Sequence, residues 1–217
     1  MTYDASGNSK RIKEYSTFEK YTTRNVHIYR KTMVYLRLAE ALNRAGYPRF
    51  AFQFLKTGVN NQIIAKEVIP YYRADSVWIS KFDFPNIQYV IEEPMGNTSA
   101  TTMGIHSVGS GFTSVNEYYV MPDDTLLAEQ ARVQYQIEKV EDLIMDEEAL
   151  EFAFEGYRFY DLMRVALRRN DPSYLANRVY NRRGAENVGT MHSLIQADLN
   201  DTRTWYLKWG DKIGLGY

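Results

Sequence analysis

The 217-residue sequence contains no cysteine. This absence excludes disulfide bonds, thiolate metal sites and a cysteine nucleophile, and it leaves no thiol on this chain to carry a lipid anchor. Histidine is scarce as well, and His27, His106 and His192 are too scattered along the chain to predict a metal site. We therefore expect neither a bound metal nor a cofactor.

An excess of one charge and a long apolar run are also missing. The formal net charge is -1, whereas a protein that follows a phosphate backbone usually carries a large positive excess. No segment approaches the ~18 consecutive apolar residues of a membrane-spanning helix, and residues 1–15 lack the apolar core of a signal peptide. We therefore expect no nucleic-acid partner and no transmembrane helix.

Aromatic residues are abundant instead, at 14% of the chain, and most of them are tyrosine. Tyrosine and tryptophan rings can stack on the C–H faces of sugars, while neighbouring Asn, Gln and Asp side chains bind the hydroxyls. The alternative is that such rings plug loops onto a helical core. Trp78 is the best candidate anchor because its neighbours, in RADSVWISKFDF, are mostly polar or charged. The predicted ligand-binding residues are Trp78, Tyr71, Tyr72 and Tyr89.

The clearest secondary-structure signal is a pair of short helices. Apolar residues recur at steps of three and four over residues 31–45, and Gly46 is placed to end that helix. Pro48 can open a second helix that ends at Gly58, because a missing N–H costs nothing in the first turn. Residues 31–58 therefore predict a helical hairpin of the tetratricopeptide type, which needs further helices to cover it.

The rest of the chain divides into a loop-rich region, a second helical region and a tail. Residues 59–122 predict long loops with helical turns and short strands, one of them at 87–91. Helices are expected at about 124–144, as one long helix over 146–170, and at 172–182. The resulting fold class is all-α, with tetratricopeptide-like helix pairs, loop-rich insertions and minor short strands. The predicted segments are 31–58, 59–122, 123–183 and a C-terminal tail at 184–217.

The helix expected at 146–170 carries charges on neighbouring stripes. A glycosidase needs two carboxyls that face a sugar from opposite sides, about 5–10 Å apart. Glu151 and Glu155 would lie side by side on one helix, so we expect no such enzyme. We expect an i,i+3 ladder of ion pairs instead, formed by Glu155, Arg158, Asp161 and Arg164.

The glycine-rich run at 104–111 and the single Gly156 each lead to an expectation. The run GIHSVGSG at 104–111 lacks the lysine and the spacing of a phosphate-binding loop, and glycine turns explain it better. Gly156 lies inside the expected long helix, where glycine is unfavourable. We therefore expect another backbone to pack closely against Gly156.

Three stretches together resemble one protein family. They are LRLAEALNRAG (36–46), GIHSVGSG (104–111) and MDEEALEFAFEGYRFYDLMRVALRRND (145–171), and the most specific part is FEGYRFYDLMR (154–164). The chain end WYLKWGDKIGLGY adds to the likeness. These stretches resemble the C-terminal half of a SusD/RagB-type nutrient-binding outer-membrane lipoprotein.

The resemblance implies a function as well as a fold. Such proteins are not enzymes; they lie on the cell surface of Bacteroidetes, bind oligosaccharides or polysaccharides, and cover a SusC-like TonB-dependent transporter. Their fold is all-α with tetratricopeptide-like pairs. The family's usual length is about twice that of this chain. We therefore expect this chain to be a fragment, with the N-terminal half of the same protein as its partner. That half would carry the signal peptide and the lipidated cysteine. The alternative function is a tetratricopeptide-like protein-interaction module without a small ligand.

Overall fold

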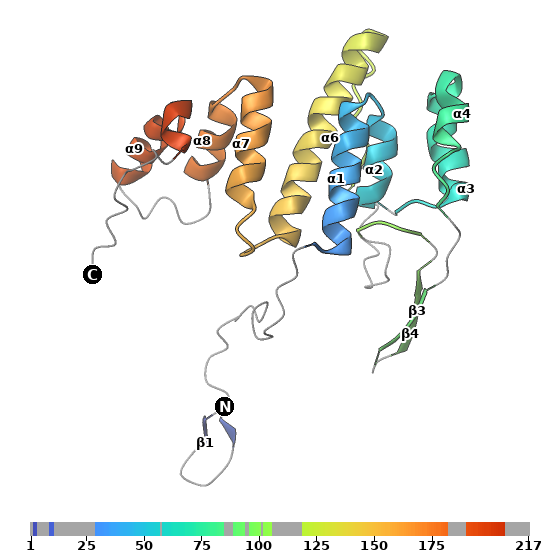
Figure 1. Ribbon diagram of the computed structural model, residues 1–217, viewed down its shortest axis with the longest axis horizontal. Helices are drawn as coiled ribbons and strands as arrows, with labels where there is room; N and C mark the ends of the chain where they lie inside the picture. Colours follow the sequence, from blue (N-terminus) through green and yellow to red (C-terminus); the bar gives the residue numbers. More distant parts are fainter. Residues whose placement is uncertain are drawn as a thin grey trace. The chain divides into compact units, whose positions relative to one another are not determined.

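The computed structural model (Figure 1) describes most of the second half of the chain and parts of the first. The chain divides into two compact units, Met1–Lys31 and Thr32–Tyr217. In the first unit, strands β1 (Thr2–Tyr3) and β2 (Ser9–Lys10) pair antiparallel. The helical part of the chain, from Thr32 of the first helix onward, belongs to the second unit. The described residues are 2–3, 9–10, 29–56, 58–84, 89–93, 96–100, 102–105, 119–181 and 190–206.

The predicted helical hairpin is confirmed as α1 (Lys31–Arg44) and α2 (Pro48–Lys56). Gly46 adopts a φ of +94° after α1, and the Tyr47 N–H returns to the Leu42 carbonyl at 3.0 Å. This left-handed residue closes the end of α1 and reverses the chain into α2. The hairpin then buries an aromatic row from α2, formed by Phe50, Phe52 and Phe54.

Short helical segments follow α2 where loops with helical turns were expected. Asn60 caps the first, because its side-chain oxygen accepts the Ile63 N–H at 2.7 Å. The segments form one column beside α2 (Figure 1). They are α3 (Asn61–Ile63), η1 (Ile64–Val68, a π-helix), η2 (Ile69–Tyr71), η3 (Arg73–Asp75) and α4 (Ser76–Ile79).

A β-hairpin follows this column. Strands β3 (Tyr89–Glu93) and β4 (Gly96–Ala100) pair antiparallel, with Tyr89 opposite Ala100 and Glu93 opposite Gly96. The short strand predicted at 87–91 is thus found two residues later. Beyond the hairpin, the chain returns to the end of α2.

Two glycines allow the chain to return there. Val59 and Met103 exchange two backbone hydrogen bonds of 2.8 Å. Gly58 has a φ of +77°, and a Cβ on Gly104 would lie 2.5 Å from the Gly58 Cα. Only residues without a side chain permit this contact.

The prediction of a single long helix over 146–170 is wrong. Helix α6 (Glu129–Glu151) passes through Asp146, and α7 begins only at Arg158 (Arg158–Arg169). Between them Phe154 and Gly156 have φ values of +65° and +82°, which no helix accommodates. Gly156 is exposed and no atom would lie within 4 Å of an added Cβ, so the predicted close packing there is wrong as well. Gly156 serves a turn instead.

Three further elements complete the second unit. The helix predicted at 172–182 is confirmed as α8 (Ser173–Tyr180). The segment expected to be a tail contains α9 (Thr190–Leu199), which packs against α8, and η5 (Thr202–Trp205). Trp205 is buried, and its indole N–H donates to the Leu199 carbonyl at 2.8 Å.

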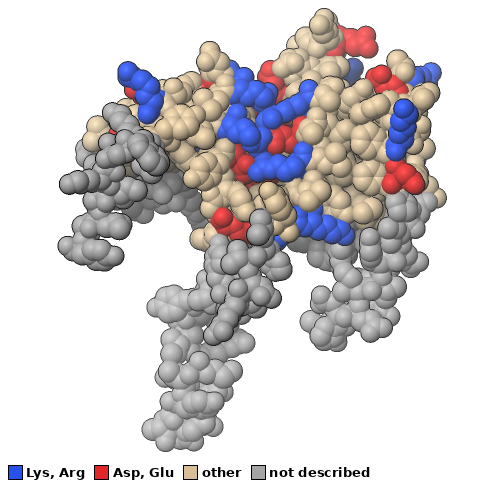
Figure 2. Space-filling view, in the orientation of Figure 1, with Lys and Arg blue, Asp and Glu red and all other residues tan. Residues whose placement is uncertain are grey.

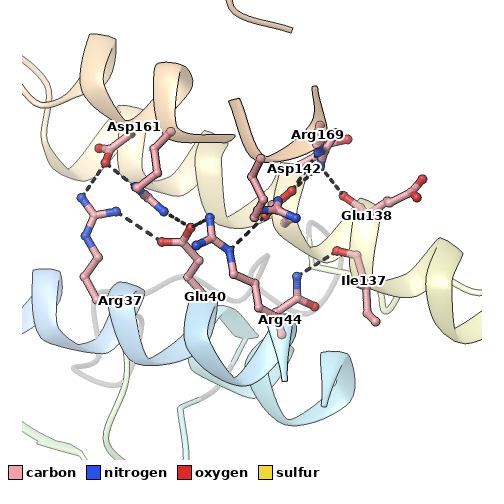
Figure 3. A network of polar contacts seen from close by, with 12 residues as sticks. Arg37, Glu40, Arg44, Ile137, Glu138, Asp142, Asp161 and Arg169 are labelled. Atoms are coloured by element: carbon pink, nitrogen blue, oxygen red, sulfur yellow. Dashed lines mark hydrogen bonds and ion pairs between the residues drawn. The ribbon is translucent and has the colours of Figure 1, made fainter. Parts of the chain in front are cut away.

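The predicted all-α class with minor strands is confirmed. Side chains of the helices form one buried apolar cluster, which includes Leu36 of α1, Phe54 of α2 and Ile144 of α6. Buried Asn43 joins two helices, because its side-chain amide donates to the Ile137 carbonyl of α6 at 2.8 Å (Figure 3). None of the described helices has both the length and the apolar character that a membrane span requires.

Candidate functional site

Two of the four predicted ligand-binding residues, Tyr72 and Trp78, pack on one ring, and a third, Tyr71, is the chain neighbour of Tyr72. Tyr71 ends η2, Tyr72 follows it, and Trp78 lies on α4. Tyr47, in the turn between α1 and α2, joins them: its ring stacks on Trp78 at 4.9 Å between centroids and meets the edge of Tyr72 at 5.1 Å. We call Tyr47, Tyr71, Tyr72 and Trp78 the aromatic cluster. The fourth predicted residue, Tyr89, begins β3, and its side-chain contacts lie outside the described residues.

The cluster is both anchored and accessible. Trp78 meets the edge of Phe82 at 4.9 Å, and Phe82 in turn packs on Phe50 of the buried core at 5.4 Å. Trp78 is nevertheless 40% exposed, and Tyr71 is 57% exposed. Trp78 therefore fits both alternatives. One part of its ring packs against Phe82 and the core, and another part is exposed to solvent, where it can stack on a ligand.

Hydrogen-bonding groups surround these rings. Burial raises the pKa of Tyr47, and a hydrogen bond to Asp75 raises it further. Tyr72 accepts the backbone N–H of Arg49 at 3.1 Å, and burial raises the pKa of Tyr72 to about 12. Both hydroxyls stay protonated at neutral pH, so Tyr72 keeps a proton to donate while Asp75 supplies acceptor oxygens.

A cation completes the edge of the cluster. The Arg49 guanidinium lies 4.0 Å from the centroid of the Tyr71 ring and 3.3 Å from Asp123. The cation–π contact fixes Tyr71 even though more than half of that residue is exposed. The arrangement offers flat apolar faces flanked by fixed donors and acceptors, which is the chemistry that binds a sugar ring.

A second feature is a group of charges between the helices, shown in part in Figure 3, which we call the ion network. It joins α1, α6, α7 and α8, and most of its carboxylates are buried whereas its guanidiniums are half-buried or partly exposed. Its members are Arg37, Glu40, Arg44, Glu141, Asp142, Glu148, Asp161, Arg164, Arg168, Arg169 and Arg178.

At one end of this network, three buried carboxyls are contacted by three guanidiniums, those of Arg37, Arg44 and Arg164. Arg37 donates to Glu148 at 2.9 Å, to Asp161 at 2.6 Å and to Glu40 at 3.4 Å. Arg164 pairs with Glu40 and, at 3.2 Å, with Asp161. Burial, and then the nearby Asp161 charge, raises the pKa of Glu148 to about 8. One Glu148 oxygen is buried without a hydrogen-bond partner among the described residues.

The predicted i,i+3 ladder is largely wrong. Asp161 and Arg164 do form such a pair within α7. Glu155, however, lies in the break before α7, and Arg158 donates to the Met145 carbonyl at 2.5 Å. Because the helix is broken there, most of these charges find their partners on other helices.

Other expected features are only partly described. Glu151 ends α6 and Glu155 lies in the following break, so the two do not share one helix. Most of the glycine-rich run 104–111 lies outside the described residues. In the described part of the chain, no three His, Asp or Glu side chains gather in a way that could hold a metal ion.

Comparison with known proteins gives one match. Residues 116–207 match the model of the SusD family. Over these residues the chain is similar to the SusD family. No curated protein and no solved structure matches the chain in the same comparisons. The SusD match covers α6 to η5 and includes FEGYRFYDLMR, and so confirms the family that the sequence resembled.

The family match points to nutrient binding at the cell surface. The match includes the α6, α7 and α8 members of the ion network but not the aromatic cluster, which precedes residue 116. Tyr47 was not predicted to belong to the site, because it lies more than twenty residues from Tyr71 in the sequence. The sequence signal for Tyr47 is its position between Gly46 and Pro48, in the turn that joins the two helices of the hairpin.

Proposed function

We propose that this protein binds a glycan through the aromatic cluster. The observation that carries the proposal is the stacked Trp78–Tyr47 pair, held from behind by Phe82 and still open to solvent. A preformed platform of this kind loses little conformational freedom on binding. Asp75 and the Tyr72 hydroxyl lie beside the rings, where they can hold the hydroxyl groups of a sugar.

The resemblance to SusD/RagB proteins supports a wider role. We infer that the protein acts at the outer membrane of a bacterium and delivers bound oligosaccharide to a SusC-like TonB-dependent transporter. Affinity at a single platform is expected to be weak, and engagement of several sites or of the transporter would raise it.

Trp78→Ala tests the glycan site. Titration with a panel of neutral oligosaccharides, followed by isothermal calorimetry, should show binding that weakens about 2- to 10-fold in this variant, given ~0.5–1.5 kcal/mol for an aromatic stack. Trp78→Phe should retain part of the affinity. Val77→Ala is the matched control, since Val77 neighbours Trp78 on α4 and is 75% exposed.

Melting temperatures separate binding from stability. A lower melting temperature with unchanged glycan affinity in Trp78→Ala would show that the ring is a plug alone. If no oligosaccharide on the panel binds the wild-type chain, the alternative of a tetratricopeptide-like interaction module without a small ligand replaces the proposal.

A further inference from the structure

The ion network is layered, with anions beneath and cations above. The side chains of Glu40, Glu141, Glu148 and Asp161 are at most 4% exposed. Six arginine side chains cover them, with exposed fractions from 21% to 38%, and solvent therefore meets mainly guanidinium groups. Figure 2 shows blue side chains gathered at the centre of one face, over α6 and α7. We call these residues the arginine face: Arg37, Arg44, Arg164, Arg168, Arg169 and Arg178.

The charges of this face do not cancel. Its six guanidiniums face five carboxylates, the four buried ones and Asp142. A positive excess thus remains even when every carboxyl is ionised. The buried anions also hold the guanidiniums in place, because each long side chain is fixed at its tip.

A groove opens beside this face. It lies against α1 and α7 and has a volume of about 790 Å³. Its lining includes Arg37, Arg164 and the Asp161 carboxylate that pairs with both of them, together with Tyr160 and Leu167. Tyr160 is 64% exposed and Leu167 is 45% exposed. The groove therefore combines fixed cations with an open aromatic ring and an aliphatic rim.

The arginines of the groove can accept a further anion. Among the described residues, Arg164 donates to Glu40 from one terminal nitrogen and to Asp161 from the other. A guanidinium has more N–H donors than these two bonds use, and its planar fork matches carboxylate and sulfate oxygens.

We propose that this groove is a second glycan site, specific for acidic oligosaccharides. A uronate carboxylate or a sulfate binds Arg37 and Arg164, and the ring that carries it lies on Tyr160. The inference rests on the proposed function in taking a glycan as the ligand, and it adds a separate site and a ligand class. An exposed ring beside the cations favours a sugar over a simple acidic peptide, which has no flat C–H face to stack.

Variants at Leu167 test the electrostatic part of the proposal without touching the ion network. The ligands are trigalacturonate and its neutral counterpart galactotriose, titrated into the full chain by calorimetry at low ionic strength. Leu167→Glu should weaken trigalacturonate binding about tenfold, whereas Leu167→Lys should strengthen it. Leu126→Glu is the matched control, since Leu126 precedes α6 and is 94% exposed.

Two further measurements test the nature of the ligand. Raising the salt from about 0.05 M to about 0.5 M should weaken trigalacturonate binding several-fold, because screening shortens the reach of exposed charges. Tyr160→Ala should weaken it a few-fold through loss of stacking. A sulfated trisaccharide in the same titrations decides between carboxylate and sulfate as the preferred group.

Several outcomes would overturn the proposal. They are undetectable trigalacturonate binding at low salt, equal binding of galactotriose, and equal loss in Leu167→Glu and Leu167→Lys. A poly-glutamate peptide that binds as tightly, with no effect of Tyr160→Ala, would make the face a protein-binding surface instead. The Trp78→Ala experiment uses a neutral glycan and is independent of these titrations. Failure of the acidic-glycan proposal therefore leaves the aromatic-cluster proposal unaffected, and failure at Trp78 leaves the acidic-glycan proposal unaffected.

Discussion

Glu148→Gln is expected to stabilise the protein at neutral and alkaline pH. In the native state Glu148 is 2% exposed, lies beside Asp161 and shares Arg37 with it. Burial disfavours the charged form of Glu148 and the nearby Asp161 charge adds to this effect, so at neutral pH the native state holds a proton on Glu148. Glutamine has nearly the same shape, and its carbonyl can still accept from Arg37, but it has no charge to bury.

The magnitude follows from linkage. The pKa of Glu148 rises from 4.5 to about 8 on folding. Below the lower value both states are protonated; above it the unfolded chain releases the proton while the native state retains it. The free energy of unfolding therefore falls as pH rises, by about 1.4 kcal/mol per pH unit and on the order of 5 kcal/mol in all, until the native carboxyl also ionises. At pH ~7 the loss is roughly 3 kcal/mol.

Urea denaturation at intervals from about pH 5 to about pH 9 measures this dependence. Wild type and Glu148→Gln should be similar near pH 5, and the variant should become progressively more stable toward pH 8. Glu138→Gln is the matched control, because Glu138 is an exposed residue of the same helix, and it should leave the pH dependence unchanged. If Glu148→Gln destabilises the protein equally at every pH, Glu148 is an ionised partner of Arg37 and the reasoning is refuted.

Substitutions at three other positions have defined consequences. Gly104→Ala should lower the free energy of unfolding by about 1–3 kcal/mol, because the added methyl would overlap the Gly58 backbone; an unchanged urea midpoint would contradict the close approach. Gly156→Ala should cost about 1 kcal/mol through its positive φ alone, and Gly156→Asn should cost less; a gain in the alanine variant would contradict this. Asn43→Ala should lower the free energy of unfolding by about 1–3 kcal/mol, because the Ile137 carbonyl loses the hydrogen bond from the Asn43 amide. An unchanged melting temperature would contradict this.

Local sequence signals were sufficient for the helical hairpin. Apolar spacing over 31–45, the left-handed Gly46 and the opening Pro48 all act within a few residues of one another. The same holds for α8, and for the family, because FEGYRFYDLMR is a contiguous motif. These features depend on backbone geometry and side-chain periodicity, which each segment carries by itself.

The break between α6 and α7 did not follow from periodicity. The apolar residues there, such as Phe152, continue a helical pattern, and a lone glycine is tolerated within many helices. The turn forms because α7 reverses direction to pack beside α6, and Phe154 and Gly156 adopt positive φ values to allow this. The gain from tertiary packing exceeds the cost of a strained Phe154.

Composition and polarity pointed to Tyr71, Tyr72 and Trp78, but only the tertiary structure packed Tyr72 and Trp78 on Tyr47. The charges show the same division. The sequence determined which side chains carry charge, and local spacing suggested partners three residues away. The fold decided instead that Arg37 of α1 meets Glu148 and Asp161 of other helices. Burial favours these distant pairs, because a charge removed from water must be compensated by whichever group lies closest in space.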